Sequence, residues 1–286
     1  MVKNFQIGKF CFQIISQKDI PIPEHFLLFE VSGNIIPQFT YRIFLNQVVS
    51  LPAEVLTARE NMVVYRAEGG EGRLLGTDRM ANVYAYYHEN KDASADIFVE
   101  ETVMSQRIDT VFTSLFALER RLIRQGGLIL HCAYLEHQGR GILFSAPSGV
   151  GKSTQAALWE RYRNSKIVNG DRALLRKENG KWIACGWPVC GSSEICRQAD
   201  TPIHAIVMLQ QGKENRVTSL SPGKAFSLLY PQITVNPWNS DFVRTAMNSI
   251  EDLILQVPVW HLTCDISEEG VACLERNIFP NNFDSK

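Results

Sequence analysis

The sequence has no excess charge of either sign, no long hydrophobic run and no paired-cysteine motif. Its 29 Lys and Arg residues nearly balance its 30 Asp and Glu residues, leaving a formal net charge of −1 over 286 residues. Balanced charge gives no compositional reason to expect nucleic acid or an anionic membrane as a partner. No apolar stretch approaches the roughly 20 residues that span a bilayer, and the N-terminus lacks the apolar segment of a secretory signal. We therefore expect a cytoplasmic protein with neither a nucleic-acid nor a membrane partner.

The seven cysteines are odd in number and irregularly spaced, and no C-x-x-C pattern occurs. A disulfide framework or a structural zinc site is therefore not expected, and reduced thiols of a cytosolic protein are the simpler interpretation. The remaining composition, 45% hydrophobic and 21% charged residues, is that of an ordinary globular protein. A chain of this length can form one large domain or two.

The N-terminal third is predicted to be rich in β-structure. Short runs of Phe, Val, Ile and Tyr alternate with Pro, Gly and Asn residues, as in antiparallel strands joined by turns. The predicted strands cover residues 5–15, 26–31, 39–49, 62–66 and 96–103. Residues 107–124 then change to a helical period and end at Gly126 and Gly127. We place a domain boundary near residue 105, with a β-rich region at 1–105 and a second domain at 106–286.

The second domain alternates strands and helices. Predicted strands cover 127–135, 141–145, 166–169, 203–209 and 259–263, with a hairpin across 177–181, and predicted helices cover 155–162, 222–230, 239–256 and 267–276. The strands outnumber those of simple βαβ units. The fold class is therefore predicted to be α/β with a mixed rather than a purely parallel sheet.

A glycine-rich turn joins the strand at 141–145 to the following helix. It reads Ala-Pro-Ser-Gly-Val-Gly-Lys-Ser-Thr over residues 146–154. Strand, glycine loop, lysine and helix in this order are typical of a phosphate-binding P-loop (Walker A motif), because glycines allow close backbone approach and the helix N-terminus favours anions. The predicted nucleotide-binding residues are Ser148, Gly149, Val150, Gly151, Lys152, Ser153 and Thr154. The expected ligands are ATP and Mg²⁺, with Lys152 on the β- and γ-phosphates and Ser153 on the metal.

One position departs from the P-loop pattern. Ala146 stands where the pattern has its first glycine, and alanine tolerates a positive φ poorly. The competing interpretation is an ordinary glycine-rich β–α turn with no ligand.

Two further residues are candidates for the chemistry. Asp171 follows a short apolar strand and lies nineteen residues after Lys152. This is the place of the metal-binding acid in P-loop sites. The alternative interpretation is that Asp171 only opens a turn. His131 lies in an apolar strand expected beside the glycine loop. A lone histidine there is more often a hydrogen-bonded core residue than a functional one.

Residues 127–265 resemble the HPr kinase/phosphorylase and PEP-carboxykinase-like superfamily, particularly its small HPr-kinase-related bacterial members. The resemblance rests on the His131 strand, Ser-Gly-Val-Gly-Lys-Ser-Thr at 148–154, Gly-Asp-Arg at 170–172, the turn at 191–195 and the strand at 202–209. It implies a mixed-sheet P-loop core and ATP-dependent phosphoryl transfer, with His131 near the transferred phosphate. The N-terminal third shows no such resemblance.

The superfamily pattern also has an acidic pair where this chain has Gly170 and Asp171. The resemblance implies that Asp171 corresponds to the second acid and that the first is missing. Glu194, after a turn of small residues, is a candidate replacement or a solvated loop acid. Arg172 and Arg197 are weak candidates for binding substrate, Arg197 by clamping a phosphate or carboxylate or merely through a surface ion pair.

The leading functional hypothesis is a kinase that transfers the γ-phosphate of ATP to a hydroxyl. The acceptor, a serine of a protein or modified peptide or else a small molecule, is not specified by the sequence. A nucleotide-binding or regulatory protein that has lost catalysis is the alternative, and PEP-carboxykinase activity ranks lower because no second-metal motif is present. The N-terminal region recruits an acceptor, caps the core or mediates homo-oligomerisation; the sequence does not distinguish these roles.

Overall fold

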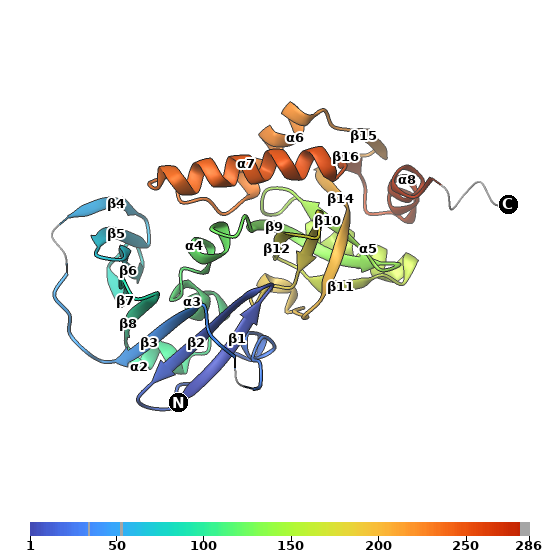
Figure 1. Cartoon of the computed structure of the whole chain (residues 1–286). Coiled ribbons are helices and arrows are strands. Elements are labelled where there is room, and N and C mark those ends of the chain that lie inside the picture. Colours follow the sequence, from blue (N-terminus) through green and yellow to red (C-terminus); the bar gives the residue numbers. More distant parts are fainter. Residues whose placement is uncertain (34, 52–53, 281–286) are drawn as a thin grey trace. The chain divides into compact units, whose positions relative to one another are not determined.

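The structure is a computed structural model that describes residues 1–33, 35–51 and 54–280 and falls into two compact units, Met1–Leu118 and Glu119–Lys286 (Figure 1). The division follows Leu118 rather than residue 105, the boundary read from the sequence. The intervening segment packs within the first unit: the Phe112 ring lies 4.8 Å from that of Phe26, and the Phe116 ring 5.0 Å from that of Tyr41.

The first unit is built on an eight-stranded sheet. Its order is β1-β2-β3-β8-β7-β6-β5-β4, and only the pairs β2–β3 and β3–β8 are parallel. The strands are β1 (Val2–Ile7), β2 (Phe10–Ser16), β3 (Phe39–Leu45), β4 (Val55–Arg59), β5 (Met62–Ala67), β6 (Gly70–Thr77), β7 (Asn82–Glu89) and β8 (Ser94–Val99), and the helices are α1 (Glu24–Leu27), α2 (Glu101–Ser105) and α3 (Asp109–Ser114).

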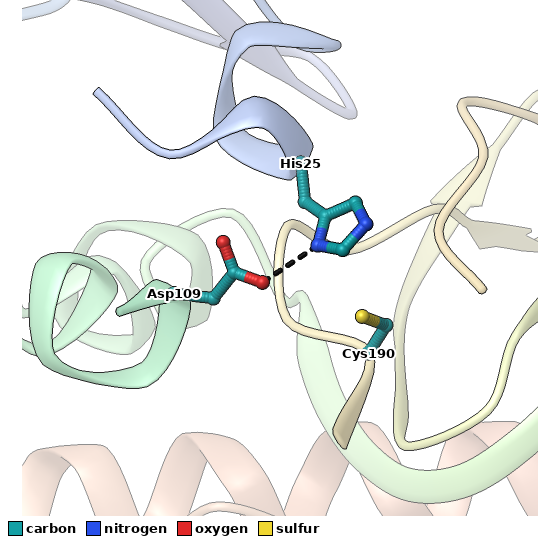
Figure 2. A group of neighbouring side chains, drawn as sticks. All are labelled: His25, Asp109 and Cys190. Carbon is teal, nitrogen blue, oxygen red and sulfur yellow. Dashed lines mark hydrogen bonds and ion pairs between the residues drawn. The ribbon is translucent and has the colours of Figure 1, made fainter. Parts of the chain in front are cut away.

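Aromatic side chains form the core of this unit. Phe12, Phe26 and Phe116 are buried and lie with their ring centroids within 6.3 Å of one another. At the edge of this core, His25 Nδ1 of α1 and Asp109 Oδ2 of α3 are 2.6 Å apart (Figure 2). This contact ties the two short helices together.

Several predictions for the first unit are wrong in detail. The predicted strand 26–31 is a helical turn, α1, followed by a single bridge from Glu30 to Phe5. The run 5–15 is a hairpin, since Gly8 adopts a φ of +59° and reverses the chain between β1 and β2. The run 96–103 spans the end of β8 and the start of α2, and β4, β6 and β7 were not predicted.

The predicted helix 107–124 is two short helices rather than one. α3 ends at Ser114, and α4 (Leu118–Ile123) begins at the last residue of the first unit. Between them Ala117 has a φ of +45°, which an α-helix cannot accommodate. The helical period of the apolar residues continues across this break, so the sequence did not reveal it.

The second unit contains a mixed sheet flanked by helices. The strands are β9 (Leu128–His137), β10 (Arg140–Ser145), β11 (Lys166–Asn169), β12 (Arg172–Glu178), β13 (Lys181–Cys185), β14 (Asp200–Gln211), β15 (Arg216–Ser219) and β16 (Val259–Cys264), and the helices are α5 (Lys152–Arg163), α6 (Pro222–Leu229), α7 (Ser240–Gln256) and α8 (Glu268–Ile278), with single 3₁₀ turns at Gly191–Ser193 and Tyr230–Gln232. The predicted mixed sheet is confirmed, as are its helices; β15 was missed.

Two long strands close part of this sheet on itself. The pairings β10-β9-β12-β13-β14 return to β10 because β14 also pairs with β10. One half of β9 pairs with β12 and the other with β10 and β11. Of the strands that flank β10, β9 is antiparallel and β14 is parallel, and β16 continues the parallel order beyond β14.

Helices cover both faces of the sheet. Residues of α6 and α7, such as Leu229 and Ile250, share one apolar core with β9 and β12. Residues of α5 and α8, such as Trp159 and Leu274, share a second core with β10, β14 and β16. The unit is therefore an α/β/α arrangement, and it fixes the turn between β10 and α5 above a packed sheet.

Two sequence expectations about environment can be compared with the structure. No helix within the described residues is long and apolar enough to cross a membrane. Four of the seven cysteines are buried, and Cys11, Cys196 and Cys273 are half-buried.

Candidate functional site

The glycine loop, defined here as residues 146–151, connects the buried end of β10 to α5. Gly149 and Gly151 have φ values of +81° and +110°, and an added Cβ would meet no atom within 4 Å at either position. Glycine is thus required by the backbone conformation rather than by crowding. Ala146 is not among the residues with positive φ. An alanine at this position therefore introduces no backbone strain, and this departure from the P-loop pattern has little structural cost.

The helix that follows this loop starts without a side-chain cap. Gly151 is its N-cap residue and supplies no side-chain hydrogen bond. The first N–H groups of an α-helix have no acceptor within the helix, and its dipole is positive at this end. Ser148, Ser153 and Thr154 are exposed around the same point, and Val150 is half-buried. The backbone N–H groups at the start of α5 therefore receive no hydrogen bond from a capping side chain.

Lys152 is buried, with 7% of its surface exposed. Its Nζ donates to the carbonyl oxygens of Ala146 (3.1 Å) and Pro147 (3.3 Å). Burial lowers the pKa of Lys152, and the nearby carboxylate of Asp171 partly offsets this effect. The lysine charge therefore lies inside the loop and is available at its inner surface.

A buried asparagine holds the turn between β11 and β12. Asn169 is fully buried; its Oδ1 accepts from the backbone N–H groups of Asp171 (2.8 Å) and Arg172 (2.9 Å). Its Nδ2 donates to the carbonyl oxygens of Trp187 (2.8 Å) and Val189 (3.0 Å). The oxygen and the nitrogen of this amide thus make two hydrogen bonds each, so the position of Asp171 is fixed.

The turn also contacts the start of α5. Ser153 Oγ donates to the carbonyl oxygen of Gly170 at 3.3 Å, one residue before Asp171. The structure thus brings Lys152, Ser153 and Asp171 to one location, as the sequence predicted. Hydroxyl and carboxylate oxygens are the donor type that Mg²⁺ prefers.

His131 and Arg172 complete the group around Asp171. The Asp171 carboxylate lies 3.7 Å from His131 Nε2 and 3.0 Å from Arg172 Nε. The backbone pairing of Arg172 with His131 between β12 and β9 produces this proximity. Burial lowers the pKa of His131, and the charge of Lys152 lowers it further. The imidazole is therefore neutral at pH 7.

Two residues at this site were not predicted from the sequence. Gln232 Oε1 lies 3.3 Å from His131 Nδ1, and Thr234 Oγ1 accepts from Arg172 at 3.3 Å. Both come from the segment after α6, which is anchored to β9 by the bond from the Thr234 N–H to the Ile129 carbonyl oxygen. Neither residue belongs to a recognisable motif, and only the fold places them beside the histidine.

The space beside Gly170 is occupied by Ser193. A Cβ at Gly170 would lie 2.0 Å from Ser193 Oγ and 2.5 Å from Ser193 Cβ. Ser193 is fixed in turn by its hydrogen bond to the Cys190 carbonyl oxygen at 2.7 Å. No side chain fits at residue 170 unless Ser193 moves, so the glycine and the serine form a matched pair.

The remaining candidates from the sequence, Glu194 and Arg197, follow the 3₁₀ turn at Gly191–Ser193 and have different environments. Glu194 is exposed, and its backbone is left-handed, with a φ of +53°. Arg197 donates from its guanidinium to the carbonyl oxygen of Ile167 in β11, and its backbone N–H donates to Val168. Arg197 therefore holds the edge of β11, an explanation that the sequence did not suggest.

A cavity of about 520 Å³ lies on the other flank of the glycine loop. Val150 and Gly151 form one wall, and residues that end or follow β14 and β16, including Gln211 and Asp265, form the opposite wall. Gln211 Nε2 donates to the Val150 carbonyl oxygen at 3.3 Å, which joins the two walls.

The fold and this site together define an α/β protein with a glycine loop, a buried lysine and an acidic turn on a mixed sheet. Residues 97–279 match the family described as SynChlorMet cassette protein ScmC, which covers more than half of the 286-residue chain. The chain belongs to this family. No curated protein matches the sequence at a significant level.

Among solved structures, the HPr(Ser) kinase/phosphatase from Coxiella burnetii is similar to this chain. The alignment covers 54% of this chain and 95% of that one, with 14% identity and a TM-score of 0.30. A TM-score of this size is too low to establish a common fold.

The Asn169 amide predicts a large stability effect. We expect Asn169→Ala to lower the free energy of unfolding by about 2–4 kcal/mol, because two buried carbonyl oxygens and two half-buried N–H groups lose a partner. The matched control is Asn277→Ala, an exposed residue whose Nδ2 makes a single bond to the Cys273 carbonyl oxygen; it should cost no more than about 0.5 kcal/mol. Urea unfolding measures both, and equal effects would contradict the assigned role.

The contact between residues 170 and 193 predicts coupled substitutions. Gly170→Ala should destabilise the protein by about 1–3 kcal/mol through overpacking. Ser193→Gly removes the atoms that the new methyl group would meet, so the double variant should recover at least about 1 kcal/mol relative to additive effects. Urea unfolding of the four proteins gives this coupling energy. Strict additivity would show that the Ser193 side chain does not occupy this space.

The environment of His131 predicts its titration. Its ring should titrate below 6.5, and Lys152→Met should raise the pKa by removing a nearby positive charge. Ring-proton NMR, assigned with a His131→Gln variant, measures the midpoint; Lys224→Met, an exposed lysine in α6, is the control. Because the unfolded state binds the proton more tightly, this group reduces folding stability as the pH falls below about 6.5. A midpoint unchanged by Lys152→Met would place the two groups apart.

Proposed function

We propose that this protein is an ATP-dependent kinase that transfers the γ-phosphate to a hydroxyl group. One arrangement carries the proposal: Lys152 and the uncapped start of α5 meet the Asp171 turn through the hydrogen bond from Ser153 to Gly170. The backbone N–H donors of α5 and the lysine, which together can bind an anion, thus lie beside a carboxylate that can hold a metal. An ordinary β–α turn requires no such conjunction.

The residues present fit both expected ligands. The glycine loop offers exposed backbone N–H groups and two positive-φ glycines that let a phosphate approach. Ser153 Oγ and the Asp171 carboxylate are oxygen donors that would hold Mg²⁺. When bound, the metal supplies positive charge that neutralises the developing charge on the phosphoryl group.

The reaction transfers one phosphoryl group and one proton. The acceptor oxygen forms a bond to the γ-phosphorus as the bond to the β–γ bridging oxygen breaks, and ADP leaves. Lys152 and the loop amides stabilise the charge on the phosphate oxygens. Because Asp171 would hold the metal, the neutral imidazole of His131 is the group that would accept the hydroxyl proton, at Nε2, with Gln232 positioning the ring through Nδ1.

A second candidate function is a nucleotide-binding protein without transfer. The contact between Gly170 and Ser193 favours it, because a residue with a side chain has no room at the first acid position. In this case Asp171 and Lys152 still bind the nucleotide and metal, and no acceptor is phosphorylated. The two functions share the binding step and differ only in turnover.

Substitution of the loop lysine tests nucleotide binding. We expect Lys152→Met to weaken Mg-ATP binding at least tenfold, about 1.4 kcal/mol, because the phosphates lose their contact with the partly desolvated positive charge of the lysine. Lys224→Met on α6 changes the net charge equally and should leave the affinity within about twofold. Isothermal titration calorimetry measures both. If the wild-type protein binds no Mg-ATP, both proposed functions fail.

Turnover distinguishes the two functions. Incubation with γ-labelled ATP and a panel of hydroxyl acceptors, including serine peptides, should give labelled product from the wild-type protein and much less from Asp171→Asn. Loss of the proton acceptor should also lower the rate as the pH falls below the pKa of His131. Binding without labelled product from any acceptor supports the second function.

A further inference from the structure

The two flanks of the glycine loop differ in chemistry. The flank toward β9 and β11 carries the ionisable group of His131, Asp171 and Arg172. The flank toward β14 and β16 carries the 520 Å³ cavity, with Val150 and Gly151 in its wall. A molecule that follows the loop therefore has charged groups at one end and a partly open cavity at the other.

We propose that this cavity binds the nucleoside of the nucleotide whose phosphates the glycine loop holds, an inference that rests on the proposed function. Its volume is within the usual range for small-ligand sites, roughly 300–1,000 Å³. It also lies where the parallel strands β14 and β16 reach their carboxyl ends, beside the equivalent end of β10. Ligands of open α/β sheets bind at such strand ends.

Fixed polar groups surround the cavity. Asp265 Oδ1 accepts from the Ser267 N–H (3.0 Å) and from Ser267 Oγ (2.5 Å), so the carboxylate has a defined orientation and its other oxygen remains for a ligand donor. Gln155 is 4% exposed, and its Nε2 donates to Cys264 Sγ and the Asp265 carbonyl oxygen. Its Oε1 is buried with no hydrogen-bond partner in the described part of the chain. Because Gln155 Oε1 has almost no accessible surface, the acceptor that the cavity offers to a hydroxyl or amino group of a nucleoside is the carboxylate of Asp265.

Apolar surface lines the same cavity. Leu209 lies in its wall, and Ile266 lines it while 77% of the Ile266 surface is exposed. An aliphatic side chain left this exposed beside a polar rim is suited to cover one face of a planar base. Lys213, also in the wall, adds a cation near the loop. Base, ribose and phosphates then each have a matching surface.

Geometry favours the nucleoside over the acceptor as the occupant. An acceptor hydroxyl must reach the γ-phosphate next to Asp171, and Ser153 connects that turn with the loop on the flank away from β14. Gln211 instead ties the cavity wall to the loop backbone through Val150. The phosphate chain consequently runs from the cavity, along the loop, to the acidic turn.

Photolabelling of the full-length protein locates the base directly. With 8-azido-ATP and Mg²⁺, the label that excess ATP suppresses should appear in peptides containing residues 209–213 or 264–266. An ATP-suppressible label confined to other peptides would overturn the assignment of this cavity and leave the proposed function intact. Absence of any ATP-suppressible label, together with no heat on titration of Mg-ATP, would instead defeat the proposed function.

A matched pair of exposed aliphatic residues provides the second test. Ile266→Asn should weaken Mg-ATP binding by about threefold to tenfold, while Leu255→Asn, equally exposed on α7 at 76%, should change it less than twofold. Both variants should bind inorganic tripolyphosphate as the wild type does, because the loop is unaltered. Unchanged ATP binding by Ile266→Asn, or an equal loss for ATP and tripolyphosphate, would contradict nucleoside binding here.

Discussion

The amide of Asn169 is the interaction on which the candidate site depends. It is fully buried and joins the backbone N–H of Asp171 to the backbone carbonyl oxygens of Trp187 and Val189. Without it the buried carbonyl oxygens of Trp187 and Val189 would lose this hydrogen-bond donor, at a cost of about 1–2 kcal/mol each. The amide thereby sets the position of Asp171, which in turn lies close to His131 and Arg172. A short polar side chain at the end of an apolar strand thus determines the geometry of the ionisable group.

The single acid of this turn follows from packing as well as from sequence. Ser193 occupies the space beside Gly170, and Gly191, with a φ of +58°, would bring a Cβ within 3.1 Å of the Asp171 side chain. The 3₁₀ turn at residues 191–193 therefore presses against both members of the Gly-Asp pair. Replacing Gly170 by an acid alone would not create a two-carboxylate site, because the neighbouring turn must first make room. The proposed transfer therefore relies on Asp171 and a neutral histidine, and the alternative proposal stops at binding.

Sequence patterns were informative where local backbone preference and burial agree. The glycine loop, α5 and the order of strands and helices in the second unit followed from apolar periodicity and from Gly and Pro positions. They failed where contacts distant in sequence decide the structure. The strand β6, which was not predicted, contains Gly70 and Gly72, and a Cβ at Gly72 would meet the Tyr86 hydroxyl at 2.8 Å. Gln232 reaches His131 across 101 residues, and no local pattern marks such a contact.

The hydrogen bonds that Lys152 makes within the loop affect the proposed binding of phosphate. Its ammonium group now donates to the carbonyl oxygens of Ala146 and Pro147 and is shielded from water. A phosphate at the loop, as proposed above, would compete with these two carbonyl oxygens for the ammonium, and it would add the attraction between two opposite full charges that a neutral carbonyl group does not supply. The exchange therefore favours an anion over water or a neutral ligand. Because the lysine is already desolvated and held within the loop, little side-chain entropy remains to be lost. On the proposed function the loop is thus preorganised for an anion, and the cavity on one flank and the acidic turn on the other would select among anions.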